Sequence, residues 1–272
     1  EAEARISIFD RGFVFADAVY EVTSVIDGKL MDFDGHFARL ERSLGELSIQ
    51  NPVTKDALLA IHHELLAKNN LTEGMVYLQI SRGNPGDRDF LFPADDVAPT
   101  VVLFTQVANL VASPKAASGI KVISIPDIRW GRRDIKTVQL LYPSMGKMMA
   151  KKAGVDDAWF VQDGFVTEGT ANNAYIVKGG KIITRELSND ILHGITRAAV
   201  LRLAAEAQLA VEERNFTVEE AKAADEAFVT SASAFVMPVV AIDEAAVGSG
   251  APGPVARRLR EIYLDEMRRT AV

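Results

Sequence analysis

The chain has 272 residues, of which 48% are hydrophobic and 25% charged, and its formal net charge is −7 at pH 7. These values are typical of a globular protein large enough for two domains, and the negative charge argues against a nucleic acid or an anionic membrane as partner. The absence of cysteine excludes disulfides, thiolate catalysis and zinc–thiolate sites, and it fits a cytoplasmic location. No apolar run approaches the ~18 residues of a transmembrane helix, so we expect no membrane span.

The first third of the chain alternates strand and helix signals. Residues 18–26 predict a strand, Asp27-Gly28 a hairpin turn and residues 29–33 the returning strand. Asp34 is the expected N-cap of a helix with an apolar stripe. The stripe consists of Phe37, Leu40, Leu44 and Leu47. Further along we predict a helix over residues 54–68, a strand over 75–80, a long loop over 82–96 and a strand over 100–105.

The second part is richer in strands. They are predicted at residues 120–125, 157–161, 174–177, 182–184, 226–229 and 237–242, and Gly179-Gly180 forms a hairpin turn. Helices are predicted at residues 195–207, 218–223 and 255–269, and Thr217 opens the second of them with a capping box. We therefore predict an α/β (α+β) two-domain fold. A small N-terminal domain covers residues 1–107, a linker 108–118 and a large C-terminal domain 119–272.

Several familiar motifs do not have the context that would give them meaning. Residues 248–253 match G-x-G-x-x-G but lie too close to the end for a dinucleotide-binding βαβ unit. His62 and His63 are adjacent, so on a helix they point about 100° apart and predict no metal site. The chain has no P-loop and no G-x-S-x-G elbow.

Two other segments carry candidate chemistry. Lys136 follows three arginines and has apolar neighbours; both conditions disfavour its ammonium form and would keep the amine nucleophilic. The arginines are Arg129, Arg132 and Arg133, and the apolar neighbours are Ile135, Val138, Leu140 and Leu141. Glu168 follows a short predicted strand. It is either a solvated loop charge or a buried carboxylate that holds a heterocyclic nitrogen protonated.

Together, four motifs resemble those of the fold-type IV pyridoxal-phosphate enzymes. They are Asp134-Ile135-Lys136-Thr137, Val166-Thr167-Glu168-Gly169, residues 191–197 (ILHGITR) and residues 36–43 (HFARLERS). The resemblance covers nearly the whole chain and implies pyridoxal 5′-phosphate as the cofactor. It also implies that Lys136 forms the Schiff base and shuttles a proton, and that Glu168 pairs with the pyridine nitrogen.

The resemblance further implies a set of phosphate ligands. Arg39 would bind the phosphate with its guanidinium. Ile195 and Thr196 would offer backbone N–H groups at the start of a helix. Ser231 and Ala232 would lie in the other phosphate-side loop, where Ala232 can offer only its backbone.

The substrate pocket most resembles that of the D-amino-acid transaminases. Tyr20 and Val22 would line it, and Arg88 matches the arginine that binds the substrate carboxylate. Phe90 stands where those enzymes have a histidine, which leaves room for less polar amines.

We therefore predict a D-amino-acid transaminase that passes an amino group from a D-alanine-like donor to a 2-oxo acid by a ping-pong cycle. An (R)-selective amine transaminase is the alternative, followed by a branched-chain aminotransferase or an aminodeoxychorismate lyase. The resemblance also implies a homodimer with active sites between the domains and near the subunit interface. The expected partners are otherwise small molecules, with no metal.

Overall fold

The computed structural model describes residues 3–272, and its internal contacts divide the chain into two compact units. The first unit holds the N-terminal part up to Ala108, the segment Ile135–Gln139 and Val272. The second unit holds Asn109–Asp134 and Leu140–Ala271. The predicted limits of the domains and linker stay a prediction, but the segment Ile135–Gln139, which we had expected in the C-terminal domain, groups with the first unit.

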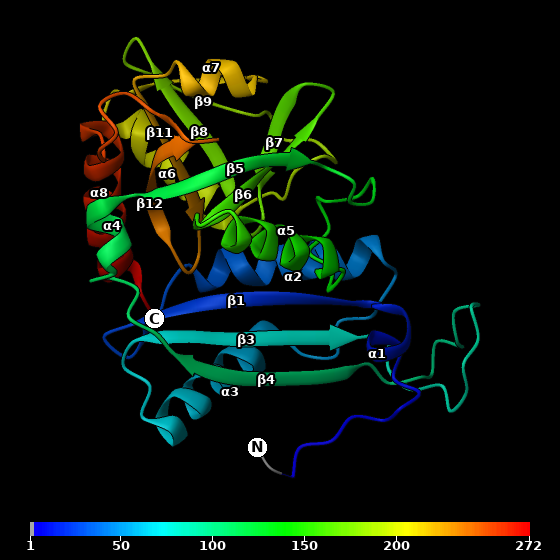
Figure 1. The fold of residues 1–272 in the computed structure, drawn as a ribbon. Helices are drawn as coiled ribbons and strands as arrows, with labels where there is room; N and C mark the ends of the chain where they lie inside the picture. Colours follow the sequence, from blue (N-terminus) through cyan, green and yellow to red (C-terminus); the bar gives the residue numbers. More distant parts are fainter. Residues whose placement is uncertain (1–2) are drawn as a thin grey trace. The chain divides into compact units, whose positions relative to one another are not determined.

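The first unit is a four-stranded sheet with two long helices (Figure 1). The strands follow the order β2-β1-β3-β4, and every pairing in the sheet is antiparallel. The elements are α1 (Arg11–Phe15), β1 (Ala18–Ile26), β2 (Lys29–Leu30), α2 (Phe33–Glu46), α3 (Lys55–Asn69), β3 (Gly74–Ser81) and β4 (Thr100–Val107).

The core of the first unit lies between one face of this sheet and the helices α2 and α3. In β3 the buried Val76, Leu78 and Ile80 alternate with the half-buried Tyr77 and Gln79, as expected when a strand has one face packed and one open. The apolar stripe predicted for α2 is mostly confirmed, since three of its four residues are buried. These are Phe37, Leu40 and Leu44.

The start of α2 differs from the prediction. Asp32 is the N-cap residue, in the left-handed conformation and without a side-chain capping bond, and Asp34 lies inside the first turn. An acidic residue there interacts favourably with the helix dipole, so the residue type suits both positions. Thr54 caps α3 with its side chain, accepting a hydrogen bond from the Ala57 N–H.

The second unit is built on a mixed sheet of nine strands. Their order is β10-β9-β8-β11-β12-β5-β6-β7, with β13 paired to β12. The strands are β5 (Ile120–Pro126), β6 (Asp157–Gln162), β7 (Phe165–Gly169), β8 (Asn173–Lys178), β9 (Lys181–Thr184), β10 (Ala210–Glu213), β11 (Glu226–Ser231), β12 (Phe235–Ile242) and β13 (Ala245–Ala246). The helices are α4 (Pro114–Ser118), α5 (Leu141–Lys152), α6 (Ile195–Glu206), α7 (Val218–Lys222) and α8 (Pro254–Thr270).

The central strands of this sheet are buried almost throughout. Each of the strands β8, β11 and β12 has a single residue that is not buried. Strands covered on both faces in this way appear in a sequence as nearly continuous apolar runs. The predicted turn at Gly179-Gly180 is confirmed, and Thr217 accepts a hydrogen bond from the Glu220 N–H as half of the predicted capping box. Within residues 3–272 no helix is long and apolar enough to cross a membrane.

Candidate active site

Lys136 lies in a segment that extends the first unit's sheet at the edge of β1. The Tyr20 N–H donates to the Lys136 carbonyl at 3.0 Å, and the Val138 N–H donates to the Ala18 carbonyl at 3.1 Å. The Lys136 N–H in turn donates to the Ser43 hydroxyl of α2 at 3.4 Å. The backbone of Lys136 is therefore fixed on both sides, and its side chain lies beside Tyr20.

The amine of Lys136 lies over an aromatic ring. Its Nζ is 4.2 Å from the centroid of the Tyr20 ring, a distance at which the ring face attracts a cation. Tyr20 stacks on Tyr77 at 5.6 Å between ring centroids, and Val22 is half-buried on the same face of β1. The structure therefore brings Lys136, Tyr20 and the Val22 face together in the first unit.

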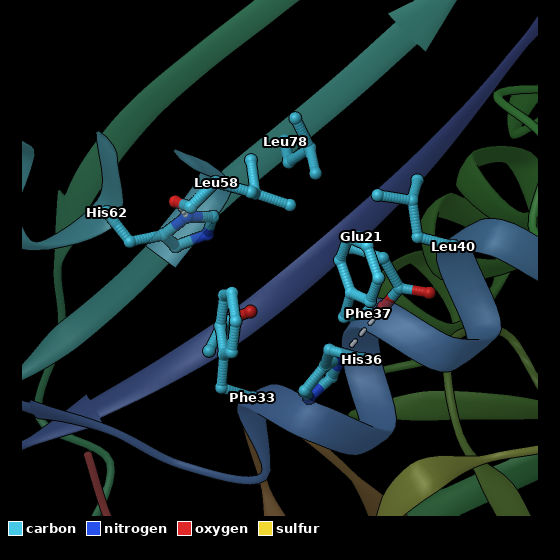
Figure 2. Close-up of a pocket in the computed structure, with 9 residues that line it drawn as sticks. Glu21, Phe33, His36, Phe37, Leu40, Leu58, His62 and Leu78 are labelled. Atoms are coloured by element: carbon cyan, nitrogen blue, oxygen red, sulfur yellow. Dashed lines mark hydrogen bonds and ion pairs between the residues drawn. The ribbon is translucent and has the colours of Figure 1, made fainter. Parts of the chain in front are cut away.

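Arg39 projects from α2 onto a buried glutamate of β1. Its Nε and Nη2 donate to the two carboxylate oxygens of Glu21 at 2.8 and 2.7 Å. The Nδ1 of His36 lies 2.7 Å from Oε2 of the same carboxylate, a contact that Figure 2 shows. Burial alone would raise the pKa of Glu21, but Arg39 and His36 outweigh it and lower that pKa to about 2. The predicted phosphate ligand is thus held in a rigid ion pair.

Figure 2 also shows a small cavity beside this ion pair, lined by Glu21, His36 and His62 together with apolar side chains. Burial lowers the pKa of His62, whose Nδ1 lies 2.8 Å from the Leu58 carbonyl oxygen. The cavity belongs to the packing of α2 and α3 on the sheet.

Arg88 and Phe90 lie in the loop between β3 and β4. The Arg88 guanidinium lies over the Phe90 ring at 5.0 Å and over the Phe15 ring at 4.9 Å. Phe90 is 75% exposed. Among the described residues Arg88 has no hydrogen bond, ion pair or ring contact with Tyr20 or Lys136, so the structure does not bring these predicted pocket residues together.

The three arginines that precede Lys136 each have a carboxylate partner. Arg129 pairs with Asp127, Arg132 with Asp134, and the Arg133 Nη1 lies 3.5 Å from carboxylate oxygens of both Asp127 and Asp190. Each of these arginine charges is therefore neutralised by a carboxylate, which the sequence pattern alone did not indicate. Leu141, one of the expected apolar neighbours, is also exposed.

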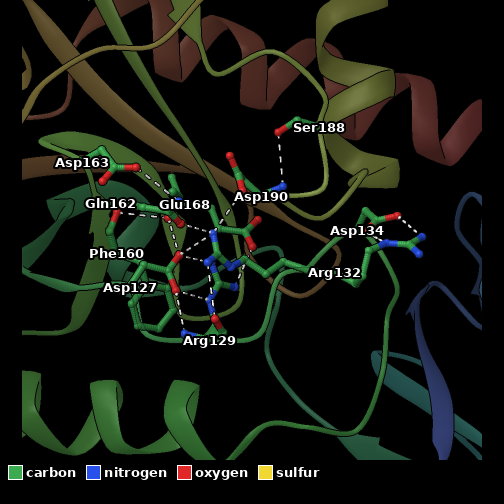
Figure 3. A network of polar contacts seen from close by, with 12 residues as sticks. Asp127, Arg129, Arg132, Asp134, Phe160, Gln162, Asp163, Glu168, Ser188 and Asp190 are labelled. Carbon is green, nitrogen blue, oxygen red and sulfur yellow. Dashed lines mark hydrogen bonds and ion pairs between the residues drawn. The ribbon is translucent and has the colours of Figure 1, made fainter.

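Glu168 is part of a buried polar network in the second unit (Figure 3). It lies within β7 rather than after it, is 4% exposed, and its Oε1 accepts one hydrogen bond from Arg129 Nη1 at 2.7 Å. Burial raises the pKa of Glu168, and Arg129 and the Leu192 N–H only partly oppose this shift. Of the two interpretations of Glu168, the structure supports the buried carboxylate.

The other oxygen of Glu168 is tied to the segment before α6. Oε2 accepts from the Leu192 N–H at 3.0 Å and from Asn173 Nδ2 at 3.1 Å. A Cβ on Gly194 would lie 2.1 Å from the Asn173 Oδ1, so only glycine fits at this N-cap. Glu168 and the start of α6 are thereby held in one place.

The remaining predicted phosphate ligands lie near this same end of the sheet. Ile195 and Thr196 form the first turn of α6, and no described side chain caps that turn. Ser231 ends β11 and Ala232 follows it; the preceding residue, Thr230, pairs with Asn173 of β8. Uncapped N–H groups at the start of a helix are a general anion site, so this end of the second unit suits a phosphate.

Asp127, Arg129 and Asn173 also belong to this site, although the sequence analysis assigned no role there to any of them. Arg129 binds Glu168, Asp127 binds Arg129, and Asn173 joins Glu168 to the start of α6. The sequence contained Arg129 in the basic cluster, but no local pattern pairs it with Glu168, which is 39 positions away.

Comparison with known proteins places these residues in a family. Residues 18–242 match the family model described as amino-transferase class IV. The chain is 39% identical over 259 residues to the D-alanine aminotransferase of Staphylococcus haemolyticus, covering 95% of this chain and 91% of the relative. The corresponding enzyme of Bacillus licheniformis is 38% identical, with 95% and 90% covered.

A solved structure agrees with this result. The T.th. branched-chain amino acid aminotransferase, solved with pyridoxamine 5′-phosphate, superimposes with a TM-score of 0.89 at 25% identity, covering 98% of this chain and 90% of that one. The predicted fold-type IV architecture, the aminotransferase activity and the pyridoxal-phosphate cofactor are confirmed. The chain belongs to the amino-transferase class IV family.

Proposed function

We propose that the protein is a D-amino-acid transaminase that moves an amino group from a D-alanine-like donor to a 2-oxo acid by a ping-pong cycle. Relatives named D-alanine aminotransferase match 95% of the chain at up to 39% identity, and this observation carries the choice of donor. The branched-chain enzyme, at 25% identity, supports the fold and the cofactor rather than the donor.

The residues present fit pyridoxal 5′-phosphate. Glu168 is a buried carboxylate with a raised pKa, and a protonated ring nitrogen is the cationic donor that such a group accepts. The uncapped first turn of α6, with Ile195 and Thr196, suits the phosphate. Ser231 and Ala232 would add to it from the end of β11, and Arg39, whose Nε and Nη2 bind Glu21, would add its charge. Lys136 supplies the amine that would attach the cofactor covalently.

When bound, the cofactor supplies a carbonyl that exchanges amino groups and a ring that accepts electron density from the substrate Cα. Lys136 Nζ would take the proton from Cα of the donor and pass it to C4′ of the cofactor. Because Nζ lies on one face of the cofactor, both transfers would take place on that face, which would fix the stereochemistry. The Tyr20 hydroxyphenyl ring, 4.2 Å from Nζ, limits where that amine can swing.

Arg88 would bind the substrate carboxylate, because a guanidinium matches the two carboxylate oxygens. Phe90 would replace a polar contact with an aromatic wall, and Tyr20 and Val22 would line the rest of the pocket. The Arg88 guanidinium lies beside both the Phe15 and the Phe90 ring, and these two rings also contact each other at 5.2 Å, which supports a cation held in place by aromatic side chains.

We also propose a homodimer in the cytoplasm. The first unit exposes large apolar side chains in the Arg88 loop and in the N-terminal segment up to α1, and such side chains are typical of a surface that a partner covers. They are Ile8, Phe13, Phe90, Leu91 and Phe92. Sedimentation should give twice the monomer mass, and the monomer mass alone would contradict this part of the proposal. The cysteine-free sequence fits a reducing compartment.

The test is the visible spectrum of the purified protein loaded with pyridoxal phosphate. D-alanine should convert the absorbance of the bound cofactor to that of the pyridoxamine form, L-alanine should leave it unchanged, and 2-oxoglutarate should reverse the change. Lys136→Ala should abolish the conversion. A response to L-alanine or L-leucine instead would contradict the D-amino-acid assignment.

Phe90 favours one second candidate, an (R)-selective amine transaminase. An exposed phenyl ring in place of a polar partner for a carboxylate lowers the penalty for an apolar substituent. A higher kcat/KM for (R)-1-phenylethylamine than for D-alanine would decide for this candidate, and Phe90→His should then shift the ratio back toward D-alanine.

A further inference from the structure

Asp127 is a charged residue of the second unit that the proposed mechanism does not use. The residue is half-buried as a whole but its side chain is 0% exposed, and it follows directly on β5. Its Oδ1 accepts from Arg129 Nε at 3.0 Å and its Oδ2 from Arg129 Nη2 at 2.7 Å. Thr167 donates its hydroxyl to Oδ2 at 2.7 Å.

This arrangement decides how Arg129 meets Glu168. Since Asp127 occupies Nε and Nη2, only Nη1 reaches Glu168, through one hydrogen bond of 2.7 Å. The Phe160 ring, 4.4 Å from the guanidinium carbon, holds the plane of Arg129 in place. Among the described residues, Oε1 of Glu168 accepts that single bond and so has a lone pair for a further donor.

The charges follow from the same contacts. Asp127 and Glu168 are two carboxylates that share one guanidinium, which leaves a net charge of −1 on the three groups. Arg133, Asp190 and Arg185 continue the network, so that three carboxylates face three guanidinium groups and the six charges cancel. Whichever boundary is drawn, removing the charge of Asp127 makes the surroundings of Glu168 more positive by one unit.

We propose that Asp127 is a positioning residue. It binds Nε and Nη2 of Arg129 and neutralises the guanidinium charge, so that Glu168 keeps a negative charge for a protonated ring nitrogen. The inference rests on the proposed pairing of Glu168 with the cofactor. Without the Asp127 charge, Arg129 would neutralise Glu168 by itself. The ring nitrogen would then face no net negative charge, and its pKa would fall.

The direct test is nitrogen NMR of the enzyme loaded with pyridoxal phosphate labelled with ¹⁵N in the ring, titrated with pH. In the wild-type protein the ring nitrogen should stay protonated over the accessible range. Asp127→Asn, which keeps the shape and loses the charge, should lower the pKa of that nitrogen by roughly 1–3 units, with a fall in kcat of about tenfold or more.

Two variants separate this role from a structural one. Thr167→Val removes a hydrogen bond to the same Asp127 oxygen but no charge, and it should titrate as the wild type does. Arg129→Gln changes the charge in the opposite direction, so its ring nitrogen should stay protonated over the accessible range as it does in the wild type. If Asp127→Asn fails to fold, Arg129→Gln tests the same inference alone, and a lowered pKa of the ring nitrogen in it overturns the proposal.

The outcomes also distinguish the inference from the proposed function. If the wild-type protein bound no pyridoxal phosphate, the proposed function itself would fail. If it loaded normally and Asp127→Asn titrated like the wild type, only the role of Asp127 would be overturned.

Discussion

Two buried glutamates, one in each unit, are paired with an arginine and yet titrate in opposite directions. Glu21 is 2% exposed and Glu168 is 4% exposed. The pKa of Glu21 is lowered to about 2, whereas the pKa of Glu168 is raised. Burial pushes both pKa values up, so the difference must come from their partners.

The partners differ in number and in how much of their charge is available. Glu21 receives both arms of Arg39 and a contact from His36, whereas Glu168 receives one arm of an arginine whose other two nitrogens belong to Asp127. Glu21 is thus a completed ion pair that holds α2 on β1, while Glu168 is left short of positive charge. The comparison shows that a buried carboxylate kept for a ligand is marked by incomplete pairing, not by burial.

The largest expected effect comes from removing the negative charge of Glu168, which we propose pairs with the ring nitrogen of the cofactor. Glu168→Gln should lower kcat on the order of 1000-fold, equal to about 4 kcal/mol in the barrier. The cofactor-free protein should not lose stability at neutral pH, because a carboxyl with a raised pKa destabilises the fold once pH exceeds its unfolded-state pKa. Steady-state kinetics and thermal unfolding of the apoprotein check both halves.

Glu206→Gln is the matched control for this variant, because Glu206 is an exposed glutamate of α6. It should leave both quantities unchanged. A large loss of apoprotein stability in Glu168→Gln would show that Glu168 is a structural ion pair like Glu21.

Sequence reasoning predicted the elements better than the pairings. The strand of residues 18–26 was located to the residue, because β-branched and aromatic residues run between clear turn signals. Short elements such as α1 (Arg11–Phe15) and β10 (Ala210–Glu213) were missed, because four or five residues are too few to show a period.

The same limit applies to the site. Lys136 and Glu168 were chosen because their motifs occur in order along the chain, and motif resemblance needs no knowledge of contacts. The role of Asp127 depends on which nitrogens of Arg129 bind which carboxylate. That choice is determined by the rotamer of Arg129, which tertiary packing sets and local sequence does not. For the same reason the carboxylate partners of Arg129, Arg132 and Arg133 could not be predicted.

The second prediction breaks the completed pair. Glu21→Gln should lower the free energy of unfolding by roughly 3–4 kcal/mol, because the buried Arg39 loses its counter-charge. Chemical denaturation at pH 7 measures this. Glu41→Gln, at an exposed position of α2, the helix that carries Arg39, should have little effect, and equal losses in the two variants would contradict the role given to the pair.

Acidification should separate the two glutamates without a mutation. A carboxyl whose folded-state pKa is depressed contributes stability above its unfolded-state pKa, and this is lost as pH falls toward the folded-state value. For Glu21 the window runs from the ordinary glutamate pKa of 4.5 down to about 2 and corresponds to about 3 kcal/mol.

Glu168 has the opposite sign, since a raised pKa means that protonation on acidification relieves a cost. The pH dependence of unfolding below pH 4.5 should therefore flatten in Glu21→Gln and persist in Glu168→Gln. If the dependence flattened in Glu168→Gln instead, the two assignments would have to be exchanged.

The smallest effect concerns the third member of the completed pair. His36→Leu removes the 2.7 Å contact to Glu21 and should cost about 1.5–2 kcal/mol, while His36→Asn, which keeps a donor near the same place, should cost less. In a Glu21→Gln background the difference between Leu and Asn should shrink, because the charge that strengthens this hydrogen bond is gone. An undiminished difference in that double-mutant cycle would mean that His36 acts through its packing against the cavity, and that Arg39 alone gives Glu21 its low pKa.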